Sequence, residues 1–217
     1  MKVSPEERFQ SLCILENDLR EKGINTIAGV DEAGRGPLAG PVVAGAVVFL
    51  NLPDTLEIDD SKKISSARRK KVFNYLVSSK DVAIGFGVIS EEVIDDTNIR
   101  EASFEAMRKA LFSLPLKPDH VIVDGYSIPQ LEIPQRGVIG GDRECLSIAA
   151  ASIIAKVIRD DMMDRFDKEY PGYGFSQHKG YGTRAHMESL RRLGPCKIHR
   201  KSFRPVKIAL EQMSEGG

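Results

Sequence analysis

The sequence feature that most constrains this chain is the block Gly-Val-Asp-Glu-Ala-Gly-Arg-Gly at residues 29–36. The apolar run before it predicts a buried strand, and two adjacent carboxylates, Asp31 and Glu32, come where that strand is expected to end. Buried carboxylates are costly unless they are paired or bind a cation. The glycines that follow let the backbone approach a ligand closely. The block therefore indicates a site for a hard metal ion that handles phosphate.

Length and composition limit the class of protein. The 217 residues can bury a sizeable core, and we expect one domain, 1–217, in which about 171–217 form a C-terminal loop and helical extension. The chain begins without the apolar stretch of a signal peptide, and its longest apolar run is too short to span a bilayer, which needs about 20 residues. Three widely spaced cysteines are typical of reduced thiols. We therefore expect a cytoplasmic protein with no membrane partner, and we expect a monomer because nothing in the sequence indicates an obligate dimer.

The charge is neutral overall but unevenly distributed. Lys and Arg total 31, as do Asp and Glu, yet residues 176–207 hold nine basic residues and one acid. Residues 62–71 hold six basic residues and no acid. Two basic patches beside clustered carboxylates suit an enzyme that grips a polyanion and cuts it through a metal ion. Two solvated helix faces would give the same pattern, and charge alone does not choose between them.

The hydrophobic pattern predicts strands that come first as a cluster and then alternate with helices. That order is typical of a mixed α/β sheet with helices packed on it. The expected strands are 26–31, 42–50, 82–89, 120–125 and 136–140. The expected helices are 5–22, 66–78, 90–114, 144–170, 184–193 and one that begins near residue 205. The apolar stripe of the longest helix is carried by Leu146, Ala150, Ile153, Val157 and Met162.

The glycine-rich turn at residues 34–39 loosely matches a dinucleotide-binding fingerprint. That fingerprint requires a helix to begin there, because the helix N-terminus binds the pyrophosphate. Pro37 and Pro41 interrupt the segment, and a strand follows. We therefore exclude a dinucleotide site. The sequence also contains no P-loop and no His-Glu-x-x-His metalloprotease motif.

Asp124 strengthens the metal-site interpretation. It ends a predicted strand as Asp31 does, and neighbouring strands would place the two carboxylates side by side. Like charges that close repel unless a cation neutralises them, and Mg²⁺ or Mn²⁺ is the natural choice. Glu32 reaches the same place only if its strand ends or twists there, because neighbours on a regular strand face opposite ways. Independent capping of two turns would give the same pattern.

Two other features remain open at this stage. The long helix offers a further carboxylate at Asp160 or Asp161, and periodicity does not choose between them. The segment 171–183 interleaves aromatic rings with glycines and positive charge. Such rings can stack on sugars or bases, or they can simply anchor a loop. The histidines of this C-terminal part, which either contact phosphate or pack, are His178, His186 and His199.

Taken together, the motifs resemble those of the bacterial ribonuclease HII family, of the type 2 ribonucleases H. The matching segments follow the family's order over well over half of the chain. They are 28–43, 60–63, 123–125, 140–142, 147–157 with 159–160, 178–183 and 199–203. The resemblance implies a ribonuclease H-like fold, with a mixed five-stranded sheet flanked by helices and a C-terminal helical extension.

The resemblance also implies an activity. Such an enzyme hydrolyses the RNA strand of RNA–DNA hybrids and incises on the 5′ side of single ribonucleotides embedded in duplex DNA. The catalytic and metal-binding acids would be Asp31, Glu32, Asp124 and Asp160. Two Mn²⁺ or Mg²⁺ ions can activate water and stabilise the leaving oxygen of an in-line displacement. The products would carry 5′-phosphate and 3′-hydroxyl ends.

The substrate-binding residues that the resemblance implies are Gly34, Arg35, Gly36, Lys62, Lys63 and Tyr181. The glycine-rich turn would contact the ribonucleotide 2′-hydroxyl and phosphate, the tyrosine would pack on the sugar, and the lysines would hold the backbone. Two rival functions remain. A junction resolvase would cut branched all-DNA substrates, and a non-catalytic binding module would show no carboxylate-dependent metal site.

Overall fold

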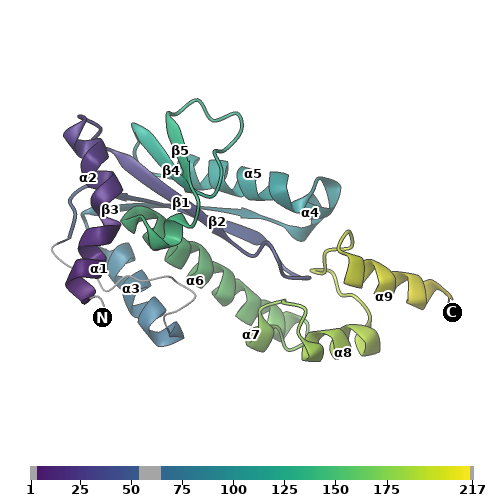
Figure 1. The fold of residues 1–217 in the computed structure, drawn as a ribbon. Coiled ribbons are helices and arrows are strands. Elements are labelled where there is room, and N and C mark those ends of the chain that lie inside the picture. The colour runs from purple at the N-terminus through teal and green to yellow at the C-terminus, as the bar shows by residue number, and fades with distance from the viewer. Residues whose placement is uncertain (1–3, 54–64, 216–217) are drawn as a thin grey trace.

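The computed structural model describes residues 4–53 and 65–215, which form a mixed five-stranded sheet with helices on both faces (Figure 1). The strands are β1 (Ile27–Ala33), β2 (Val42–Phe49), β3 (Val82–Ile89), β4 (His120–Asp124) and β5 (Gln135–Val138). Their order in the sheet is β3-β2-β1-β4-β5. The β1–β2 and β2–β3 pairs are antiparallel, whereas β1–β4 and β4–β5 are parallel. The expected mixed sheet is confirmed.

The helices include two pairs where the sequence predicted single helices. They are α1 (Pro5–Leu12), α2 (Ile14–Glu21), α3 (Ser66–Ser78), α4 (Glu91–Asp96), α5 (Ile99–Phe112), α6 (Leu146–Glu169), α7 (Phe175–His178), α8 (Arg184–Leu193) and α9 (Arg204–Glu215), with a 3₁₀ turn at Gly141–Arg143. The helix expected over 5–22 breaks at Cys13. That over 90–114 breaks before Asn98, whose side chain caps α5 by accepting from the N–H groups of Arg100 and Glu101. Within the described residues, no helix has the length and apolar character needed to cross a membrane.

Two helices, α5 and α6, cover opposite faces of the sheet (Figure 1). Alternate residues of β1 serve the two faces, so that Ala28 and Val30 pack in the cluster that includes α5. Gly29 faces α6, and a Cβ atom there would lie 2.2 Å from the carbonyl carbon of Ser147. The absence of a side chain therefore lets α6 lie directly against β1. Asp31 belongs to this same α6-facing set.

The start of α6 is capped by a residue from the N-terminal part of the chain. Cys145, at the N-cap position, makes no capping hydrogen bond with its side chain. Glu16 of α2 supplies the cap, because its Oε1 accepts from the Ser147 N–H at 3.0 Å and from the Ser147 hydroxyl at 2.9 Å. A carboxylate at this helix end is also favoured by the helix dipole. This role of the N-terminal helices was not predicted from the sequence.

The C-terminal extension, from α7 to α9, lies at the end of the molecule remote from α1 and α2 (Figure 1). Two apolar clusters join it to the loop that follows β1. Ala39 packs with Met163, Tyr173, Phe175 and Ile198, and Leu38 packs with Leu190, Val206 and Ala209. The other predicted stripe residues of α6 are buried, but Met163, not Met162, is the buried methionine.

Candidate active site

Asp31 and Asp124 lie at the same edge of the sheet. Their strands are parallel, and Val30 pairs with Val123, one residue before each aspartate. Asp31 is only 4% exposed. Burial, and then the negative charges of Glu32 and Asp124, raise the pKa of Asp31 well above its usual range. The structure therefore brings together the carboxylates that the two strand ends suggested.

Two hydrogen bonds orient Asp31. Its Oδ1 accepts from the Glu32 N–H at 2.7 Å, and its carboxylate also accepts from the hydroxyl of Ser152 on α6. Ser152 is itself buried, with 4% of its surface exposed. Sequence reasoning assigned no role to this serine. The available signal was a hydroxyl within the otherwise apolar run from Ala149 to Ile154.

The sequence suggested that the strand ends at Asp31 and that Glu32 follows it, but in the structure Glu32 lies within the strand. The β1–β2 ladder continues through Glu32 and Ala33, so the strand runs two residues past Asp31. Glu32 is nevertheless close enough to Asp31 and Asp124 for their charges to interact. Its Oε1 accepts from the Arg35 guanidinium at 3.1 Å. Burial raises the pKa of Glu32 above its usual value. The positive charge of Arg35 lowers this pKa, and the negative charge of Asp124 raises it further.

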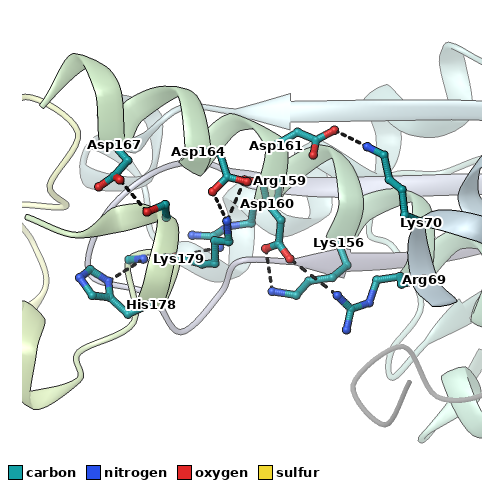
Figure 2. Close-up of polar contacts among 12 residues, drawn as sticks. Arg69, Lys70, Lys156, Arg159, Asp160, Asp161, Asp164, Asp167, His178 and Lys179 are labelled. Atoms are coloured by element: carbon teal, nitrogen blue, oxygen red, sulfur yellow. Dashed lines mark hydrogen bonds and ion pairs between the residues drawn. The ribbon is translucent and has the colours of Figure 1, made fainter. Parts of the chain in front are cut away.

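The fourth predicted acid, Asp160, makes different contacts (Figure 2). Its carboxylate pairs with Lys156 at 2.8 Å and with Arg69 of α3 at 3.8 Å. The alternative, Asp161, pairs with Lys70, and both of those side chains are about half exposed. In residues 4–53 and 65–215, no group of three or more acidic, His or Cys side chains is already arranged to hold a metal ion. The contacts therefore unite Asp31, Glu32 and Asp124 but do not place Asp160 with them.

The carboxylate edge, defined as Asp31, Glu32 and Asp124, has the donor chemistry that a hard divalent cation requires, although the three side chains are not arranged around a common point. Its donors are all carboxylate oxygens, which Mg²⁺ and Mn²⁺ prefer. One of them, Glu32 Oε2, is buried without a hydrogen-bond partner among the described residues. A nearby cation would relieve both the repulsion between these groups and the cost of that unpaired oxygen.

The glycine-rich turn lies beside a residue from the C-terminal extension. Gly34 adopts a φ of +98°, and a Cβ atom there would lie 2.1 Å from Nε of Arg159. A Cβ atom at Gly36 would lie 3.7 Å from the Tyr181 ring, which is ordinary contact. Tyr181 is 45% exposed. The structure thus brings the turn and Tyr181 together, with the Arg35 side chain about half exposed, while Lys62 and Lys63 lie outside the described residues.

The other aromatic rings of this segment belong to the core. Tyr173 and Phe175 are buried and stacked, with ring centroids 5.2 Å apart. His178 packs beside them: its Nδ1 accepts from the Gly180 N–H at 3.2 Å, which leaves Nε2 to donate to the Tyr173 carbonyl at 2.9 Å. Of the two readings of these rings, the structure favours the loop anchor for Tyr173 and Phe175.

His186 and His199 form a buried chain that ends at Tyr181. The Cys196 N–H donates to Nδ1 of His199 at 3.0 Å, so Nε2 of His199 carries the proton. That nitrogen donates to Nε2 of His186 at 3.1 Å, and Nδ1 of His186 donates to the Tyr181 carbonyl at 3.0 Å. Burial lowers the pKa of each histidine to about 4. Both are therefore neutral packing groups, not phosphate contacts.

Comparison with known proteins gives a consistent result. The family model described as Ribonuclease HII matches residues 28–206. Ribonuclease HII of Chlamydia trachomatis serovar L2 is 50% identical over 204 residues, which cover 94% of each chain. The crystal structure of ribonuclease H2 from Pyrococcus horikoshii OT3 aligns with a TM-score of 0.70 at 26% identity, over 88% of this chain and 99% of that one.

A more distant structure shares the fold alone. It is that of Bst-RNase HIII in complex with Mn²⁺, which aligns with a TM-score of 0.61 at 16% identity, over 88% of this chain and 70% of that one. The family match spans every strand of the sheet except the first residue of β1, as well as the carboxylate edge and Tyr181. The chain therefore belongs to the ribonuclease HII family and is a nuclease, a hydrolytic enzyme.

Proposed function

We propose that this enzyme hydrolyses the RNA strand of RNA–DNA hybrids and also incises 5′ to a single ribonucleotide in duplex DNA. Family membership supports endoribonuclease activity on hybrids. The observation that carries the proposal is the carboxylate edge, in which the charges of the partly buried Glu32 and Asp124 repel the buried Asp31, beside the turn that contains Gly34 and Gly36. We further propose that residues 1–217 act as one monomeric domain with 171–217 as its C-terminal extension.

The metal ligands in this proposal are Asp31, Glu32, Asp124 and Asp160. The unpartnered Glu32 Oε2 supports the carboxylate edge as a cation site. Support for Asp160 comes from its family motif and from its lower exposure, 19% of the side chain against 52% for Asp161. Two Mn²⁺ or Mg²⁺ ions, when bound, supply activation of water and stabilisation of the leaving oxygen. Ser152 holds Asp31 in position for this task.

The turn and Tyr181 would recognise the ribonucleotide. Among the described residues, the backbone N–H groups of Arg35 and Gly36 donate no hydrogen bond, so they are available to a 2′-hydroxyl or phosphate oxygen. The partly exposed Tyr181 ring offers a flat apolar surface to the sugar. Nearby positive charge from Lys156, whose Nζ lies 6.0 Å from the Tyr181 ring centroid, would attract the backbone phosphates.

The test is cleavage of three labelled substrates: a duplex with one ribonucleotide, an RNA–DNA hybrid and an all-DNA duplex of the same sequence. Each is incubated with Mg²⁺, Mn²⁺ or EDTA. We expect metal-dependent incision of the first two, with 5′-phosphate and 3′-hydroxyl ends, and none of the third. Cutting of the all-DNA duplex, or of a branched DNA junction in preference to either ribonucleotide substrate, would contradict the proposal.

A further inference from the structure

We infer that Arg200 is a positioning residue that holds the loop 34–40 with its N–H groups turned toward the substrate, and so sets how well the enzyme recognises an isolated ribonucleotide. This inference rests on the proposed function of the turn. Arg200 lies in the C-terminal extension, between α8 and α9, 160 to 166 residues along the chain from the loop residues that it contacts. Its side chain is fully buried.

The Arg200 guanidinium is surrounded by main-chain carbonyl groups of a single loop. It makes five hydrogen bonds to four carbonyl oxygens. The acceptors are Gly34 at 2.6 Å, Arg35 at 3.0 Å, Pro37 at 2.8 Å and Gly40 at 2.9 and 2.8 Å. A planar guanidinium with five donors in a fixed fork suits such an arrangement, whereas a lysine ammonium does not.

This arrangement fixes which way the loop presents its N–H groups. No cis peptide bond occurs in the described residues. In a planar trans peptide, the carbonyl of one residue and the N–H of the next point in opposite directions. Because the carbonyls of Gly34 and Arg35 point at Arg200, the N–H groups of Arg35 and Gly36 point away from it. The next such peptide agrees, since the Pro37 carbonyl oxygen accepts from Arg200 and the Leu38 N–H donates to the Gly180 carbonyl.

A second buried arginine ties the same loop to α6. Arg159 donates to the Pro41 carbonyl at 3.0 Å, to the Ala39 carbonyl at 3.2 Å and to the Lys179 carbonyl at 3.0 Å. Arg159 precedes Asp160 on the helix, so one turn of α6 both holds the loop and carries a proposed metal ligand (Figure 2). Arg200 holds the loop at the turn and again at Gly40, and Arg159 adds contacts on either side of Gly40, where the chain leads into β2.

The predicted consequence concerns the choice between two substrates of the same enzyme. A continuous RNA strand offers a 2′-hydroxyl in every register, so a loosely held turn still finds one. A duplex with one ribonucleotide offers a single correct register, and misplacement of the turn by about 1 Å can cost roughly a hundredfold in rate. Loss of the Arg200 contacts should therefore impair cleavage at the isolated ribonucleotide more than cleavage of the hybrid.

The experiment compares Arg200→Lys with wild type on both substrates, with kcat and KM measured separately. We expect kcat/KM for the single-ribonucleotide duplex to fall roughly tenfold or more beyond any fall for the hybrid. The control is Arg108→Lys, because Arg108 also donates to a carbonyl, that of Pro129 at 3.0 Å, but on α5 away from the loop. An equal fall for both substrates, or no fall, would overturn the inference.

The experiment also distinguishes failure of the inference from misfolding of the variant and from failure of the proposed function. If Arg200→Lys does not fold, as judged by circular dichroism and thermal melting, Arg159→Lys takes its place and must shift the substrate ratio in the same direction. A ratio unchanged in that variant would overturn the inference. If the wild-type enzyme fails to cut the single-ribonucleotide duplex at all, the proposed function fails before any variant is compared.

Discussion

The carboxylate edge and the arginine-held loop both bury charge, but they treat it in opposite ways. At the edge, the negative charge of Asp124 raises the pKa of both Asp31 and Glu32, and Glu32 Oε2 has no hydrogen-bond partner among the described residues. In the loop, the buried guanidiniums of Arg159 and Arg200 donate to carbonyl oxygens around them. Buried charge that is fully hydrogen-bonded serves as scaffold. A buried charge whose hydrogen bonds are incomplete is instead stabilised by a bound ligand of opposite charge.

The substitution at Asp31 is expected to have the largest effect, and it tests whether the carboxylate edge differs from the loop as described. Asp31→Asn removes a proposed metal ligand and one of three neighbouring negative charges. We expect activity to fall by at least roughly a thousandfold, and the melting temperature in EDTA to rise, because an ionised Asp31 is disfavoured in the folded state. Steady-state cleavage assays and thermal melting measure the two effects.

The matched control for this variant is Asp161→Asn, which changes an exposed acid on α6 that pairs with Lys70. Its activity and melting temperature should stay close to those of wild type, because exposed ion pairs contribute about 0–1 kcal/mol. Near-normal turnover of Asp31→Asn in Mg²⁺ or Mn²⁺ would show that the edge is not the metal site. A lower melting temperature would show that its charges are not strained.

A smaller effect is expected on stability, where alanine substitutions of the two glycines of the turn should differ. Gly34→Ala places a methyl group 2.1 Å from Arg159 Nε at a φ of +98°, which should lower the free energy of unfolding by about 1–3 kcal/mol. Gly36→Ala meets only the Tyr181 ring at 3.7 Å and should leave stability within about 0.5 kcal/mol of wild type. Urea denaturation measures both. Equal losses would mean that Arg159 does not confine the loop at Gly34.

The last effect, spread over several pH units, should appear as opposite pH dependences of the carboxylate edge and of the buried histidine pair in the C-terminal extension. His186 and His199 have a pKa of about 4 when folded and about 6.5 when unfolded. The unfolded chain therefore binds more protons in this interval, and stability falls as the pH drops from about 6.5 toward 4, by at most about 1.4 kcal/mol per pH unit and histidine. His199→Gln should reduce this slope in urea titrations between pH 7.5 and 5.

Asp31 should behave in the opposite sense. Its raised folded pKa means that its penalty is absent at low pH, where it is protonated, and grows as the pH rises through that pKa. The stabilisation gained by Asp31→Asn in EDTA should therefore shrink as the pH falls. A gain that is constant with pH would indicate that the substitution stabilises by packing and not by removing charge.

Local sequence patterns predicted most of the sheet and singled out Asp31 and Asp124. Continuous apolar runs located the strands, and two such runs that each finish in Asp are visible without a structure, whereas the pairing of the two strands is seen only in the fold. The end of β1 was wrong by two residues, because its limit is set by pairing with β2 and not by Asp31 itself. The spacing of apolar residues likewise did not reveal that the predicted N-terminal helix breaks at Cys13.

The contacts that sequence reasoning did not find join residues far apart in the chain. In the sequence, Arg200 is one of several basic residues in the segment 176–207. Only the folded structure shows that its partners are carbonyl groups of residues 34–40. The Glu16 cap on Ser147 is equally remote. The histidines remained ambiguous for a similar reason, since burial by Phe175 and Tyr173 decides their protonation.

Helix α6 carries three of these attachments along its length: Ser147 to the N-terminal helices, Ser152 to Asp31 and Arg159 to the loop. An α-helix rises about 1.5 Å and turns about 100° per residue. One residue inserted or deleted between these attachments would rotate everything beyond it off its partner. Across related chains, the length of this stretch should consequently be far more constant than its composition, and natural insertions should collect in connections such as residues 113–119.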